Sequence, residues 1–186
     1  IKHITDLGMA GKIGFHESIT KRVQLLKASR DQVIDVGNQI KENFISKSVL
    51  NNINFFSQFS TQIYVISGGF NELTLPTTRY LGIPDDHIFT NQFIYNEHEL
   101  ISGLNQNNPL SQNQGKIKQL QLLNLHHPLI AIGDGFTDLE LYISKSVDSF
   151  ILFTENVQRQ NLFNNSPMKC NNFNEVLEHL FKLKII

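Results

Sequence analysis

Apolar residues recur every three or four positions through residues 1–45, which is the spacing that lines one face of a helix. The pattern is clearest at Phe15, Ile19, Val23 and Leu26. It predicts helical structure throughout this first part of the chain.

Two kinds of signal subdivide this helical stretch. Gly11 and Gly14 predict a turn before Phe15. Either Ser29 or Asp31 is placed to cap a following helix, because their short side chains accept bonds from free backbone N–H groups.

From residue 46 onward the pattern changes to short apolar runs, each followed by a helix-like stretch. The clearest runs are 62–66, 129–132 and 150–153. Alternating strands and helices predict an α/β fold with a parallel sheet. Phe93 and Tyr95 alternate with polar residues and favour a short hairpin. The Asn- and Gln-rich span 105–114 predicts an exposed loop with no core-forming capacity.

Composition narrows the class of protein. The 186 residues are 40% hydrophobic and 18% charged with a net charge of −1, which gives no electrostatic footprint for nucleic acid or an anionic membrane. No apolar run is long enough to span a bilayer. The single cysteine, Cys170, fits a structural residue in a reducing, cytoplasmic location.

The first candidate site is Ser67-Gly68-Gly69, directly after the apolar run Val65-Ile66. The carboxyl ends of parallel strands form the ligand crevice of such sheets. A hydroxyl and free backbone N–H groups at that position suit a phosphate. The alternative is an ordinary tight turn.

The second candidate site follows the apolar run at 129–132 and carries Asp134 and Asp138, four residues apart. Carboxylate oxygens in this arrangement suit Mg²⁺. The alternative is that Asp134 caps a helix and Asp138 complements the helix dipole. A third candidate, Lys116, stands at a predicted helix start and can reach a phosphoryl group, or can simply be solvated.

The order of these sites resembles the haloacid dehalogenase superfamily, and the run from Met9 to Val23 resembles the cap region of its phosphoserine phosphatases. The resemblance implies a parallel-sheet, Rossmann-like core over residues 46–186 and a small helical cap over residues 1–45.

The resemblance also implies a role for each site residue. Ser67 and the Gly68 and Gly69 amides would hold the phosphoryl group, while Lys116 would neutralise its charge. Asp134 would ligate the Mg²⁺ cofactor, and Asp138 would support that metal site.

In the cap, Arg22 would pair with the substrate carboxylate, as a planar guanidinium fork does well. Met9 and Phe15 would form an apolar wall over the substrate, or could simply pack the cap. Position 137 is Thr where the family more often has Asn, which bears on the phosphate contact and on substrate identity. Asn91 matches a family position for which we expect a structural role.

The family's nucleophile motif, Asp-x-Asp-x-Thr on the central first strand of the sheet, is missing from these residues. The adjacent acids Asp85 and Asp86 follow Pro84 without an apolar strand before them. We therefore expect the protein to extend upstream of Ile1 and to supply there both the nucleophile and the central strand.

The expected function is hydrolysis of O-phospho-L-serine to serine and phosphate in serine biosynthesis, through an aspartyl-phosphate. The alternatives are another small phosphomonoester as substrate, or an inactive fragment that keeps only the phosphate and Mg²⁺ sites. The expected partner is a small molecule, and the sequence predicts no oligomeric state.

Overall fold

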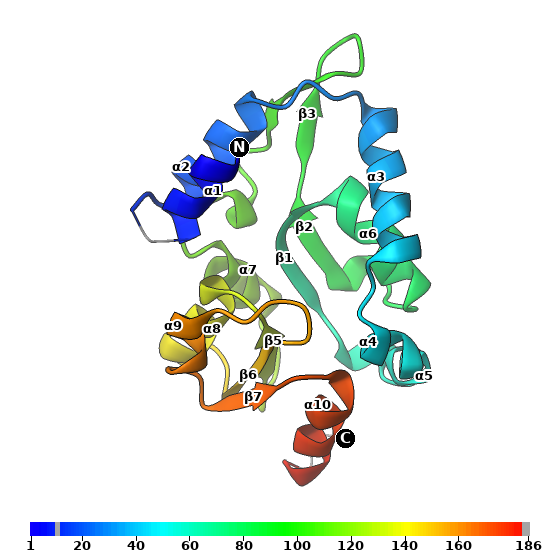
Figure 1. Ribbon diagram of the computed structural model, residues 1–186, viewed down its shortest axis with the longest axis vertical. Coiled ribbons are helices and arrows are strands. Elements are labelled where there is room, and N and C mark those ends of the chain that lie inside the picture. Colours follow the sequence, from blue (N-terminus) through cyan, green and yellow to red (C-terminus); the bar gives the residue numbers. More distant parts are fainter. Residues whose placement is uncertain (10–11, 184–186) are drawn as a thin grey trace.

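The computed structural model describes residues 1–9 and 12–183, and these form helices and strands in alternation (Figure 1). The α-helices are α1 (Lys2–Met9), α2 (Phe15–Gln24), α3 (Arg30–Asn43), α4 (Lys47–Asn51), α5 (Ile53–Gln58), α6 (Asn71–Tyr80), α7 (Gly115–Leu123), α8 (Phe136–Ile143), α9 (Gln160–Phe163) and α10 (Phe173–Lys182). The strands are β1 (Val65–Phe70), β2 (Ile88–Asn91), β3 (Phe93–Tyr95), β4 (Ile101–Leu104), β5 (Ile130–Gly133), β6 (Ser149–Phe153) and β7 (Met168–Cys170). Short 3-10 turns lie at η1 (Ser60–Gln62), η2 (Asp85–His87) and η3 (Pro109–Ser111).

The predicted α/β fold with parallel strands is confirmed. β1 pairs with β2 in parallel, and β5, β6 and β7 form a second parallel group in that order. β3 and β4 form the expected antiparallel hairpin.

Within the described residues, β1 and β5 are not hydrogen-bonded to each other. Both nevertheless pack on the same helices, because Ile66 of β1 and Ala131 of β5 contact one apolar cluster built on Leu120 of α7 and Leu141 of α8. The two parallel groups of strands therefore share one helical layer, but each has an unpaired edge.

Side-chain burial differs between β6 and β5. Phe150, Ile151 and Leu152 of β6 are at most 1% exposed, as expected for a strand with neighbours on both sides. Ile132 of β5 is 41% exposed. An apolar strand residue in a parallel sheet is normally covered, so Ile132 is an uncovered apolar side chain in the described structure.

The N-terminal helices share a core with the hairpin. Ile19 and Val23 of α2 are buried together with Phe70 of β1 and with Ile101 and Leu104 of β4. Figure 1 shows α1 and α2 on one side of β3 and α3 on the other. The cap region is thus anchored on the β3–β4 hairpin.

Helical structure in residues 1–45 is interrupted, where the sequence pattern indicated it throughout. The chain leaves α2 at Leu25, and Ser29 then forms an isolated bridge with Leu100. Of the two predicted caps, Ser29 is the one that caps α3, because its side chain accepts from the N–H of Gln32, whose own side chain accepts from the Ser29 N–H.

The expectation for residues 105–114 was wrong in one respect. Leu110 and Ser111 are only 2% and 0% exposed. Polar composition predicted a solvated loop, but Asn108 and Ser111 bond to backbone groups of their own turn, which allows the segment to fold inward. This buried turn lies next to the candidate site.

None of the helices described here is long and apolar enough to cross a membrane.

The close contact between α3 and α6 predicts that a methyl group added at Gly37 lowers the stability of the protein. A Cβ added at Gly37 would lie 2.0 Å from the carbonyl oxygen of Glu72, whereas one added at Gly103 would meet nothing within 4 Å. We expect Gly37→Ala to lower the free energy of unfolding by about 2 kcal/mol, and Gly103→Ala to change it by less than about 0.5 kcal/mol. Urea denaturation followed by circular dichroism measures both, and equal stability of the two variants would contradict this packing.

A second prediction concerns Cys170, which is fully buried. Burial raises the pKa of its thiol to about 11, and the charges of Glu175 and Glu178 add to the shift. The folded-state pKa therefore lies above the unfolded value, and the stability contributed by the neutral thiol is complete below about pH 8.5 and is lost as the pH rises through the folded value. At pH 8 we expect the native protein to react with a chromogenic disulfide reagent far more slowly than the urea-unfolded protein. A Cys170→Ser control should give no signal, and equal rates in the native and unfolded protein would refute the burial.

Candidate functional site

Ser67, Gly68 and Gly69 form an irregular end to β1. The parallel register pairs Val65 with Ile88 and Ile66 with Phe89, then shifts before Phe70. Residues 67–69 therefore bulge from the regular ladder. The Ser67 Oγ accepts from the N–H of Gly69 at 3.0 Å, so the hydroxyl hydrogen of Ser67 remains available to an anionic oxygen.

The side chain of Asn91 stabilises this loop through hydrogen bonds. Its side chain is fully buried, and its Nδ2 donates to the carbonyl oxygen of Gly68 at 3.0 Å and to that of Leu110 at 3.1 Å. The structural role expected for Asn91 is consistent with these two bonds, which join the end of β1 to η3.

Phe15, the first residue of α2, lies directly on the loop. A Cβ added at Gly68 would lie 2.9 Å from the Cζ of Phe15, so only glycine lets the ring approach this closely. The helical region thereby places an apolar ring against the predicted phosphate loop.

Lys116 and Asp138 come together as an ion pair. The Lys116 Nζ lies 2.5 Å from Asp138 Oδ1, and the two side chains are only 16% and 13% exposed. The other carboxylate oxygen, Oδ2, accepts from the N–H of Gly135 at 3.0 Å, which caps α8. The alternative that Asp134 caps this helix was wrong, because the side chain of Asp138 caps it, and Asp138 also orients Lys116.

Gly133 is required by the same carboxylate. A Cβ at this position would lie 2.2 Å from the Cγ of Asp138. The Gly-Asp-Gly spacing therefore reflects the close passage of Asp138 over the end of β5. Thr137, the second residue of α8, is half-buried.

Asp134 has a partner that the sequence reasoning missed. Arg159 donates from Nη2 to Asp134 Oδ2 at 3.1 Å and from Nε to the Asp134 carbonyl oxygen at 3.2 Å. Arg159 follows β6, whose carboxyl end lies at the same edge of the sheet as that of β5. A charged residue shortly after a neighbouring strand was the available signal.

Arg22 lies on α2, seven residues after Phe15 and so on a similar face of the helix. Its Nε donates to the Ser18 carbonyl oxygen at 3.3 Å, and burial lowers the pKa of its guanidinium. No carboxylate among the described side chains forms an ion pair with it. Met9 ends α1, and its side chain lies outside the described part of the structure.

The three motifs meet around one apolar cluster. Ile66 precedes Ser67, Ile117 follows Lys116, and Ala131 of β5 lies shortly before Asp134; all three residues contact this cluster. Residues far apart in sequence are thus brought to one edge of the two strand groups.

The donor set for a metal ion is small. Among the described residues no group of three or more His, Cys, Asp or Glu side chains comes together. Mg²⁺ is usually held by one or two carboxylates, with waters and substrate phosphate completing the shell. Asp134 is 50% exposed and has one carboxylate oxygen turned to Arg159, so it fits this minimal requirement.

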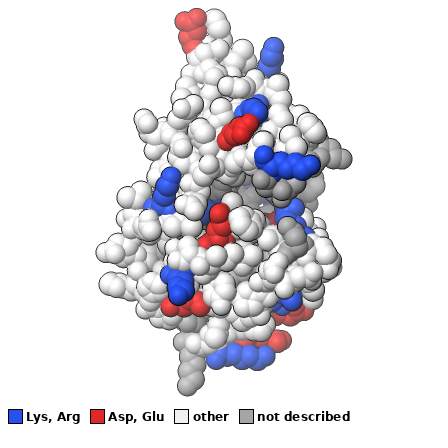
Figure 2. Space-filling view, turned by 90° about the vertical axis from the view of Figure 1, so that its left-hand side faces the viewer, with Lys and Arg blue, Asp and Glu red and all other residues white. Residues whose placement is uncertain are grey.

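The molecular surface carries both signs of charge. Figure 2 shows the face on which α1 and α2 lie, with acidic and basic side chains scattered among uncharged ones and a hollow near its middle. This distribution agrees with the net charge of −1 and gives no extended basic patch.

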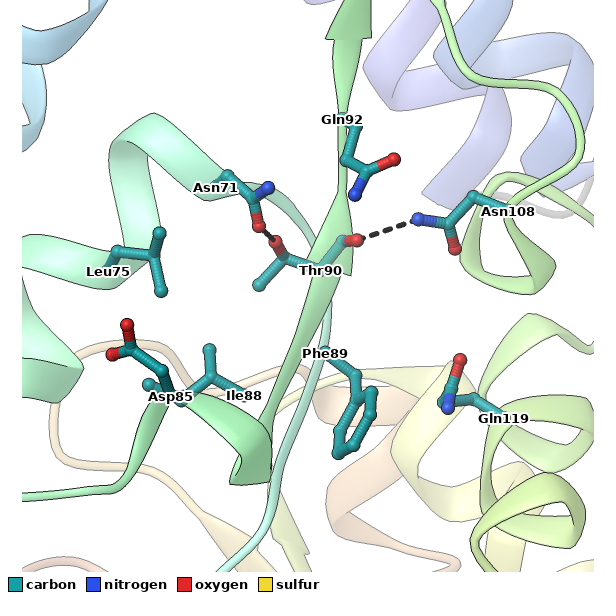
Figure 3. Close-up of a pocket in the computed structure, with 9 residues that line it drawn as sticks. All are labelled: Asn71, Leu75, Asp85, Ile88, Phe89, Thr90, Gln92, Asn108 and Gln119. Atoms are coloured by element: carbon teal, nitrogen blue, oxygen red, sulfur yellow. Dashed lines mark hydrogen bonds between the residues drawn. The ribbon is translucent and has the colours of Figure 1, made fainter.

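A separate pocket lies beside β2, between α6 and α7 (Figure 3). Its polar groups bond to one another, since Thr90 Oγ1 donates to Asn71 Oδ1 and Asn108 Nδ2 donates to the Thr90 carbonyl oxygen. It contains none of the residues predicted to carry chemistry.

Comparison with known proteins finds relatives over most of the chain. It is 31% identical over 159 residues to the chloroplastic phosphoserine phosphatase of Arabidopsis thaliana, and this match covers 80% of the chain but 51% of that protein. It is 29% identical over 185 residues to human phosphoserine phosphatase, covering 97% of the chain and 80% of the human protein. The chain therefore spans about half the length of the first relative and four fifths of the second.

Among solved structures, a phosphoserine phosphohydrolase-like protein from Francisella tularensis superposes with a TM-score of 0.85 at 27% identity, covering 96% of this chain and 83% of that one. A haloacid dehalogenase family hydrolase from Salmonella enterica, at 21% identity and a TM-score of 0.68, shares the fold over 91% of this chain and 56% of its own. No family model matches the sequence.

The parallel strands and these structural relatives show the fold of haloacid dehalogenase phosphatases. The relatives that match most of the chain are phosphoserine phosphatases, in agreement with the resemblance of its cap run.

The Lys116–Asp138 pair predicts a measurable coupling. Lys116→Met leaves a nearly buried carboxylate with only the Gly135 N–H as partner, and should lower the free energy of unfolding by about 2 kcal/mol. Asp138→Asn keeps an acceptor for Gly135, so adding it to Lys116→Met should recover about 1 kcal/mol of that loss. Urea unfolding of the wild type, both single variants and the double variant gives the coupling energy, and additive losses would contradict the pair.

Proposed function

We propose that the protein is a phosphomonoester hydrolase that converts O-phospho-L-serine to L-serine and phosphate, a step of serine biosynthesis. The observation that carries the proposal is that the Ser67–Gly69 loop, against which Phe15 lies, and the Lys116–Asp138 pair both adjoin one apolar cluster. The names of the relatives at 29% and 31% identity support the same substrate.

The phosphoryl group is held by the end of β1. The Ser67 hydroxyl donates to one oxygen, because its own acceptor position is already used by Gly69. Backbone N–H groups at the bulge bring further donors, and Gly68 and Gly69 leave room for close approach. Lys116 adds a positive charge, which Asp138 orients.

The serine part of the substrate is recognised by α2. Phe15 closes over the loop and excludes water, while the half-buried Arg22 has no carboxylate partner among the described side chains and pairs with the substrate carboxylate. Met9 completes this wall by resemblance to the family. Thr137 contributes one hydroxyl near the phosphate.

Mg²⁺ is the proposed cofactor, with Asp134 as its ligand and Asp138 as the support of the metal site. When bound, it would neutralise negative charge on the phosphoryl oxygens. Arg159 fixes the orientation of the Asp134 carboxylate by bonding both to its Oδ2 and to its carbonyl oxygen.

The attacking carboxylate is proposed to come from an extended strand that lies between β1 and β5. Among the described residues β1 pairs only with β2 and β5 only with β6, Ile132 is exposed, and one helical layer covers both groups of strands. The 186 residues contain no Asp-x-Asp-x-Thr motif, so we place this strand upstream of Ile1. An aspartyl-phosphate would then split hydrolysis into two displacements.

The test compares phosphate release by two proteins, the 186-residue chain and a form extended by the upstream coding sequence. We expect Mg²⁺-dependent turnover of O-phospho-L-serine by the extended form only. Turnover of p-nitrophenyl phosphate by the 186-residue chain would contradict the placement of the nucleophile. An extended form that binds phosphate without turnover would favour an inactive remnant.

Substrate choice is tested with Arg22→Met in the extended form. Loss of a charged hydrogen bond should lower kcat/KM for O-phospho-L-serine by about 10–100-fold. Phosphoethanolamine lacks the carboxylate and is the matched control substrate, so its kcat/KM should change little. An equal loss for both substrates would refute the role of Arg22.

A further inference from the structure

The segment between β4 and α7 forms a rigid platform beside the phosphate loop. Asn108 ties it to β2 by donating to the Thr90 carbonyl oxygen at 2.8 Å (Figure 3). Asn91 donates to the Leu110 carbonyl oxygen at 3.1 Å, and Ser111 is fully buried. The carbonyl groups of this platform are therefore held in place by the core strands.

The amino end of α2 docks on this platform. Its N-cap residue is Gly14, which has no side chain to accept a bond from the free N–H groups of the first turn. Asn113 supplies that acceptor from 97 residues away, because its Oδ1 accepts from the His16 N–H at 3.1 Å. The acceptor that caps α2 is thus supplied by the platform and not by a residue of the helix itself.

The His16 side chain makes a second link to the platform. Its Nδ1 lies 2.8 Å from the carbonyl oxygen of Ser111. A carbonyl only accepts, so the ring nitrogen is the donor. Gly14 allows the approach, since a Cβ there would lie 3.0 Å from Asn113 Oδ1.

Phe15 directly precedes the anchored His16, and its ring lies against Gly68. Gly68 is in turn bonded to Asn91, which also holds Leu110 of the platform. The platform therefore contacts the phosphate loop in two ways, through α2 and directly through Asn91.

We propose that His16 and Asn113 form a latch that positions Phe15 over Gly68 and so sets substrate affinity. They are positioning residues that act through α2. The effect on affinity rests on the proposed phosphoserine hydrolysis, whereas the position of Phe15 does not.

The position of the ring is tested in solution by nuclear magnetic resonance of the 186-residue chain. An aromatic ring against Gly68 shifts the Gly68 proton resonances, and Phe15→Leu should abolish that shift. Asn113→Ala and His16→Ala should each remove most of it. Asn113→Asp keeps the acceptor and His16→Asn places an N–H donor near the position of Nδ1, so both should retain it. Asn43→Ala, at an exposed asparagine of α3, is the matched control and should change nothing.

The functional arm uses the form extended upstream. Each alanine variant should raise KM for O-phospho-L-serine about fivefold, as for the loss of one helix cap, with kcat changed less than twofold. The conservative variants should restore KM. A Gly68 shift that survives both alanine substitutions would overturn the latch, and a lost shift with unchanged KM would overturn its role in affinity. If the extended wild type does not hydrolyse phosphoserine, the proposed function fails, while the resonance measurement still decides whether the latch positions Phe15.

Discussion

The side-chain amide of Asn91 is the interaction on which the candidate site depends. It is fully buried and donates to the carbonyl oxygens of both Gly68 and Leu110, so it sets the spacing between the phosphate loop and the platform that receives α2. Its Oδ1 has no partner within the described structure. A buried polar atom without a partner is costly, whereas both donor positions of the Asn91 Nδ2 are used.

Charge is organised around the same site by two pairs. Asp138 orients Lys116 and caps α8 at once, and Arg159 orients Asp134. Asp138 of α8 pairs with Lys116 at the start of α7. Arg159, which follows β6, pairs with Asp134, which follows β5. The arrangement pre-organises a positive and a negative group at the edge of the sheet, where a phosphomonoester and a divalent cation would need them.

Sequence reasoning succeeded where local pattern carries the physics and failed where contacts are long-range. The apolar runs predicted β1, β5 and β6 because strand propensity is a local property, and the resemblance of the ordered motifs indicated the family. The burial of Leu110 and Ser111 was missed since their segment reads as polar. Asn113 and Arg159 were missed because each acts on a residue distant in sequence.

By itself the sequence determined the α/β class and the candidates Ser67, Lys116, Asp134 and Asp138, since these follow from residue type and spacing, while a resemblance to known proteins indicated the family. Only the tertiary structure decided that Lys116 pairs with Asp138, that Phe15 lies on Gly68, and that β1 and β5 remain unpaired. The physical reason is that hydrogen bonds and close packing depend on where distant segments meet. That meeting is set by the shared apolar core and leaves no local signature in the chain.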